Sequence, residues 1–155
     1  MTQIVDPRDR RVLWLLAIGV LVSVVHYVDN VVNFDSYPQA DGGLAPSRGV
    51  IAASWFVFTA LAYAAWWLLR RGRRRAAAVA LLAYSLSGLV GLGHYSVEGA
   101  AGMPWWRHAH VVADIACGAA LAVAALWMVG RSTPQPDGDD GVRSAGADHE
   151  WSTRM

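Results

Sequence analysis

Three histidines in the sequence are each followed, three or four residues later, by an acidic residue. The pairs are His26 with Asp29, His94 with Glu98, and His110 with Asp114. Residues three or four apart on a helix lie on one face. The spacing therefore predicts three histidine–acid pairs, each formed within its own helix.

Metal binding is the first chemistry that these residue types suggest. Imidazole nitrogens and carboxylate oxygens bind transition metals, and a carboxylate can also orient a ligating histidine. His108 is a further candidate ligand, whereas Cys117 lies nearly two turns beyond His110 and is interpreted as a packing residue. The sequence predicts a site for zinc, copper or iron formed by His26, Asp29, His94, Glu98, His110 and Asp114.

Acid–base chemistry without a metal is a second interpretation. A histidine–acid pair in a low-dielectric pocket can hold a proton near neutral pH, and a second pair can deliver one. The substrate would be lipid-like. Whether the protein is an enzyme stays open, because the sequence contains no HExxH motif, nucleophile elbow or glycine-rich phosphate loop.

A resemblance to a known family supports this second interpretation. His26 and Asp29 end an apolar segment, and Tyr37-Pro38 follows soon after. This layout resembles the emopamil-binding sterol isomerase and sigma-2 receptor superfamily over about a quarter of the chain. The resemblance implies a metal-free lipid or sterol-type isomerase, or a lipid-binding protein. The second apolar segment has no acidic residue, which departs from that family's pattern.

Two further interpretations remain open. A b-type haem could lie between two histidines such as His26 and His110, although the nearby acids suit its mainly apolar pocket less well. Alternatively, the polar groups could pair with one another and with lipid headgroups, in an accessory subunit whose helices pack against a membrane-complex partner.

Four apolar segments must position these residues. They span residues 12–30, 50–69, 76–95 and 109–129, each close to the ~20 residues that a helix needs to cross the membrane. Strict two-residue alternation is absent, and lipid-facing backbone must satisfy its own hydrogen bonds, so helices are expected. The sequence predicts an all-α, integral membrane antiparallel four-helix bundle over residues 12–130.

The arginines predict the orientation of these helices. Three precede the first segment, five lie between the second and third, and Arg131 follows the fourth. The two opposite loops hold only Arg48 and Arg107. The positive-inside rule then places both termini in the cytoplasm of a multi-pass cell-membrane protein. No small-x-small cleavage site follows the first segment, so we expect a retained anchor.

Composition accounts for the rest of the chain. Residues 1–11 form a cytoplasmic N-terminus, and residues 131–155, rich in Pro, Gly, Asp and Ser, are predicted to be a disordered cytoplasmic tail. His149 lies in this tail and is excluded from any site. The formal net charge of +1 gives no support for nucleic-acid binding. The bilayer is the expected partner.

Small residues predict how the helices meet. Pairs at four-residue spacing, such as Ser87 with Gly91 and Gly118 with Ala122, let helix backbones approach closely. The same pattern could serve a homo-oligomer. In the four-helix arrangement, all four histidines outside the tail lie in one layer near the extracytoplasmic face. Facing lipid costs free energy for each charged group, so we expect them to face one another.

Overall fold

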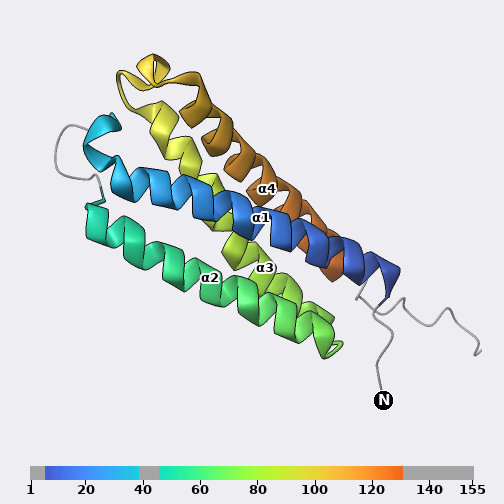
Figure 1. The fold of residues 1–155 in the computed structure, drawn as a ribbon. Helices are drawn as coiled ribbons and strands as arrows, with labels where there is room; N and C mark the ends of the chain where they lie inside the picture. The colour runs from blue at the N-terminus through green and yellow to red at the C-terminus, as the bar shows by residue number, and fades with distance from the viewer. Residues whose placement is uncertain (1–5, 39–45, 131–155) are drawn as a thin grey trace, which may run out of the picture.

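The structure, a computed structural model, describes residues 6–38 and 46–130. Four α-helices make up most of this part of the chain: α1 (Pro7–Val32), α2 (Arg48–Arg70), α3 (Arg74–Leu89) and α4 (Trp105–Gly130). Short 3₁₀ segments join them: η1 (Phe34–Ser36), η2 (Val90–Ser96) and η3 (Ala100–Gly102). The described residues contain no strand, which confirms the predicted all-α fold (Figure 1).

Local sequence signals set the ends of the first helices. The Asp6 side chain caps α1 by accepting a hydrogen bond of 2.8 Å from the Arg8 backbone N–H, and Pro7 occupies the first helical position. Ser47 caps α2 by accepting from the backbone N–H of Val50. Gly72, with a φ of +71°, makes the tight turn between α2 and α3.

All four helical stretches are long and apolar enough to cross a membrane by length and composition. α3 reaches this length together with η2, as a stretch from Arg74 to Ser96. α1 begins at Pro7 and so includes the first three arginines. The predicted tail, residues 131–155, lies outside the described residues. The cytoplasmic placement of the termini stays a prediction.

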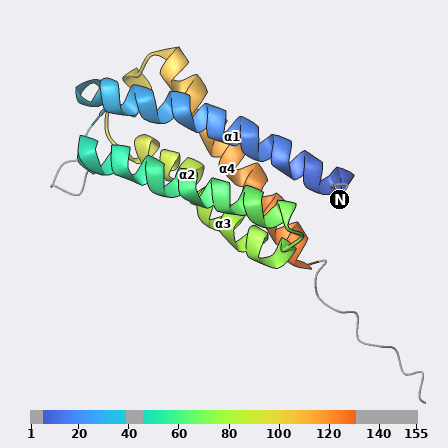
Figure 2. The same cartoon turned by 60° about the horizontal axis from the view of Figure 1, so that its bottom comes forward.

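Contacts between helices give their relative directions. The Arg8 guanidinium lies 5.9 Å from the Trp127 ring centroid, while His26 bonds to Asp114, so α1 and α4 run in opposite directions. Asp9 pairs with Arg74 at 2.6 Å, which places the start of α1 beside the start of α3. Figures 1 and 2 show the helices side by side along one long direction.

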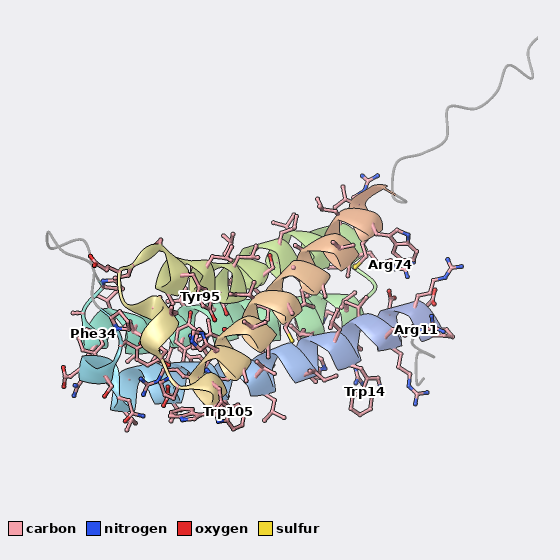
Figure 3. The ribbon with its side chains drawn as sticks, turned by 90° about the horizontal axis from the view of Figure 1, so that it is seen from above. Arg11, Trp14, Phe34, Arg74, Tyr95 and Trp105 are labelled. Carbon is pink, nitrogen blue, oxygen red and sulfur yellow. The ribbon has the colours of Figure 1, made fainter. Side chains whose placement is uncertain are left out.

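The bundle has two chemically different ends. The arginine end holds Arg11 and Arg74 and the turn from α2 to α3, and the histidine end holds η1, η2 and the start of α4 (Figure 3). The buried residues of α2 are Ala62, Ala65 and Leu69, all in its second half. At the histidine end, α2 therefore packs more loosely against its neighbours and leaves space between the helices.

α3 and α4 approach each other closely through two glycines. A Cβ atom added to Gly88 would collide with the backbone oxygen of Asp114, and one added to Gly118 would lie 2.8 Å from the backbone oxygen of Ser85. Gly118 is one of the predicted small residues. Gly88, which follows the predicted Ser87, is its partner across the interface. The two glycines hold Asp114 against α3.

Substituting Gly88 with alanine should destabilise the bundle, because α3 and α4 would have to separate. We expect a loss of about 1–3 kcal/mol, the usual cost of overpacking, measured as a lower melting temperature in detergent. Gly93→Ala is the control, since a Cβ at Gly93 meets nothing within 4 Å. Equal melting temperatures for the two variants would contradict this description of the interface.

Candidate functional site

The histidine–acid pairs of the site join different helices. His26 Nδ1 on α1 bonds to Asp114 Oδ2 on α4 at 2.7 Å, and His110 Nε2 on α4 lies 3.3 Å from Asp29 Oδ2 on α1. The predicted pairing within each helix is therefore wrong. α1 and α4 run in opposite directions, so the deeper histidine of one helix meets the deeper acid of the other. The prediction that these groups face one another is correct for both of these pairs.

His94 joins the deeper pair from α3's side of the bundle. Its Nε2 atom lies 3.3 Å from His26 Nε2 and accepts a hydrogen bond of 3.1 Å from the Asn30 side-chain amide. η2 carries His94, and Gly91 in the same segment leaves room for the His26 ring, 3.5 Å from where a Cβ would lie. The result is a chain of contacts from Asp114 through His26 to His94.

Asp29 is held by groups that the sequence did not point to. Its carboxylate accepts hydrogen bonds from the Tyr37 hydroxyl at 2.5 Å, the Asn33 amide at 2.6 Å and Arg107 Nε at 3.1 Å. Burial and the hydrogen bond to Asp29 raise the pKa of Tyr37 above its usual range, so its hydroxyl remains a donor. Asp29 thus connects the end of α1, the following loop and the start of α4.

Arg107 completes this network. Its guanidinium donates to the backbone oxygen of Ser36 at 3.0 Å and lies 4.4 Å from the centre of the Tyr37 ring. The Tyr37 ring in turn lies 5.0 Å from that of His94. The sequence places Arg107 just before the fourth apolar segment but does not indicate its partners. Its position beside His108 and His110, just before an apolar segment, was the signal for a structural role.

Two predicted residues lie outside the cluster. Glu98 is exposed in the turn after η2, and His108 stacks on Tyr95, whose hydroxyl lies 3.1 Å from His108 Nδ1. The expected pairing of Glu98 with His94 needs continuous α-helix. α3 ends at Leu89, and the extended Val97 follows η2, so the two side chains do not share a face.

The His110 side chain is only 11% exposed, and its ring nitrogens lack hydrogen bonds within the described residues. Neither ring nitrogen has a hydrogen-bond partner among the described residues, and the approach of Nε2 to Asp29 is its ionic contact. The ring centroid lies 5.5 Å from that of His26. Three imidazoles therefore touch in a row, with His26 in the middle, and each comes from a different helical segment.

A cavity of about 430 Å³ borders this row of histidines. It lies between α1, α2 and η2, where the first half of α2 packs loosely. Its walls are mainly apolar, and the lining contains no Asp, Glu, Lys or Arg. The lining includes His26, Asn30, Tyr37, Val50, Ile51, Phe58, Val90, Gly93 and His94. The histidine chain thus ends at a cavity wall.

The predicted metal site finds no support in the side-chain arrangement. In residues 6–38 and 46–130, no group of three or more His, Cys, Asp or Glu side chains could hold a metal ion. Both carboxylates of the cluster already have partners: Asp114 bonds to Nδ1 of His26, and Asp29 accepts from Tyr37, Asn33 and Arg107. No finding bears on the haem alternative.

No protein-family model matches the sequence, and no curated protein and no solved structure is significantly similar to it. The resemblance to the emopamil-binding superfamily gains no support from these comparisons. Fold and site together define an all-α protein with four helices able to cross a membrane and a buried histidine cluster beside an apolar cavity.

The buried contact of His26 with Asp114 should couple the two residues energetically. His26→Gln and Asp114→Asn should each lower the melting temperature in detergent, and the double variant should be less destabilised than the sum. A coupling between about 0.5 and 3 kcal/mol is expected for residues in direct contact.

Asp35→Asn provides the control, because Asp35 pairs with Arg48 on the surface, where its side chain is 86% exposed. Combined with His26→Gln, it should give additive effects. Additive effects for the His26 and Asp114 variants would show that the pair does not act as a unit.

Proposed function

We propose that this protein is a multi-pass membrane protein that binds an apolar small molecule in the cavity at its histidine end. The observation that carries the proposal is the cavity itself. Its volume of about 430 Å³ falls within the range of pockets that bind small molecules, and its walls combine apolar side chains with a few polar groups, as such pockets do.

The bilayer is the proposed source of this molecule. Val50 and Val90 line the cavity and are 55% and 65% exposed, so at these residues the cavity opens onto the outside surface of the bundle. In a membrane, this outside surface faces lipid. The cavity therefore borders the lipid phase, where an apolar molecule is concentrated. The arginine end would face the cytoplasm by the positive-inside rule, and the cavity would then lie in the outer half of the membrane.

The histidine cluster gives the cavity a chemical function. Asp114 orients His26, and His26 contacts His94, which lines the cavity together with it. Such a series can hold a proton or a hydrogen bond at a fixed place beside a bound molecule. This arrangement favours the second interpretation of the sequence, a protein acting on or binding a lipid-like compound without a metal.

Photolabelling tests the proposal directly. The protein in lipid nanodiscs is irradiated with a long-chain alkyl diazirine, and the labelled residues are mapped by mass spectrometry. Label should concentrate on cavity-lining residues such as Ile51 and Phe58. Gly93→Phe should strongly reduce it, because Gly93 lines the cavity and a Cβ there meets nothing within 4 Å.

Gly102→Phe is the matched control. Gly102 also lies in a 3₁₀ segment with open space around its Cβ position, but it does not line the cavity. Its labelling should equal that of the unaltered protein. Label spread evenly over the lipid-facing surface, or equal label in both variants, would refute binding in the cavity.

Metal binding is a second candidate function, because the Nε2 atoms of His26 and His94 lie at a distance that suits a shared metal ion. Two ligands of a tetrahedral zinc ion, each about 2.0–2.1 Å from it, lie about 3.3 Å apart, and the Nε2 atoms of His26 and His94 are separated by 3.3 Å. Asp114 on Nδ1 of His26 would then orient a ligand, as carboxylates do in zinc sites. Copper or iron could use the same nitrogens.

Elemental analysis after equilibration with zinc tests this candidate. It predicts about one equivalent of zinc per chain, lost in His26→Gln and in His94→Phe. His108→Gln should keep the metal, since His108 lies apart with Tyr95. Less than about a tenth of an equivalent in the unaltered protein would exclude a structural or catalytic zinc site.

A further inference from the structure

His94 presents one uncommitted nitrogen to the cavity. Its Nε2 atom is engaged by Asn30 and faces His26, whereas its Nδ1 atom has no hydrogen bond among the described residues. Nor is Nδ1 sealed in by protein, because in this part of the chain only nitrogens of Trp55 and His110 are buried without a partner. His94 lines the cavity, so this nitrogen is available to a bound molecule.

The hydrogen bond from the Asn30 amide determines whether His94 Nδ1 carries a proton. The amide N–H donates to His94 Nε2 at 3.1 Å, so Nε2 must be an acceptor. A neutral imidazole carries one proton, which then lies on Nδ1. The 3.3 Å contact with His26 then requires His26 Nε2 to be the donor, while His26 Nδ1 donates to Asp114. A metal ion on Nε2 would leave the proton on Nδ1 as well.

The hydroxyl groups of the lining already have partners. Tyr37 donates to Asp29, Ser54 to the backbone oxygen of Ile51 and Ser96 to that of Gly93, while Ser87 contacts the Tyr27 hydroxyl. The lining has no acidic side chain and no lysine or arginine to neutralise a charged ligand. Burying an unpaired charge there would be costly.

We infer that the molecule bound in this cavity is uncharged and apolar and carries a carbonyl oxygen, as in a ketone or quinone, which accepts a hydrogen bond from His94 Nδ1. The inference rests on the proposed function and names the ligand class of the same cavity. Asn30 is a positioning residue in this arrangement, since it acts through the tautomer of His94.

Matched probes test the ligand class. Two alkyl diazirines of equal length are compared in nanodiscs, one with a mid-chain ketone and one with a methylene group at that place. A single net hydrogen bond corresponds to about a five-fold difference in affinity. The ketone probe should therefore reach half-maximal cavity labelling at about one fifth of the methylene probe's membrane concentration.

Two variants connect the preference to His94. His94→Phe keeps an aromatic ring but removes the donor, and it should abolish the ketone preference. Asn30→Asp supplies an acceptor to Nε2, moves the imidazole proton to that atom and makes Nδ1 an acceptor. It should favour a secondary-alcohol probe over the ketone. Nitrogen-15 spectra of the histidine rings report the tautomer directly, independently of ligand binding.

Tyr95→Phe is the control variant, because Tyr95 follows His94 in η2 but does not line the cavity, and its hydroxyl contacts His108. It should keep the ketone preference. Cavity labelling that is equal for both probes would overturn the carbonyl inference while leaving cavity binding intact. No cavity labelling with either probe would overturn the proposed function itself. A His94 ring protonated on Nε2 in the unaltered protein would also overturn the inference.

Discussion

The buried contact between His26 and Asp114 is the interaction on which the histidine end depends. Their side chains are 5% and 3% exposed, and an unpaired polar group at such a place would be costly. The contact fixes the register of α1 against α4. Gly88 lies against the backbone of Asp114, so α3 is held to the same point. The position of His94 beside His26 follows from this three-helix junction.

The layer of histidines could be predicted from the sequence because it depends only on where apolar segments begin and end. The partners within that layer could not be predicted from residues three or four apart, since that spacing describes a single helix. His26 lies deeper than Asp29 on α1, and Asp114 lies deeper than His110 on α4. With the two helices in opposite directions, groups at equal depth meet, and both acids change partners.

Features that depend on an irregular backbone or on long-range contacts could not be predicted from the sequence. The change from α3 to η2 turns His94 toward His26 and leaves Glu98 in an exposed turn, although the sequence shows only an unbroken apolar run up to Tyr95. The hydrogen bond from Arg107 to Asp29 joins residues that are far apart in the chain. The cavity exists because α2 is buried only in its second half, a property of packing that residue types alone do not specify.

The two aspartates have different roles because their surroundings differ. Asp29 is surrounded by donors from Tyr37, Asn33 and Arg107, so its charge is balanced where it stands and it serves to hold the loop and α4 in place. Among the described residues, the Asp114 carboxylate bonds only to His26. Its influence therefore passes along one line, through the His26 ring to His94 and the cavity. A carboxylate placed behind a histidine orients the ring and strengthens its basicity. The polar layer thus has an outer half that holds the loop and α4 in place and a deeper half that ends at the cavity.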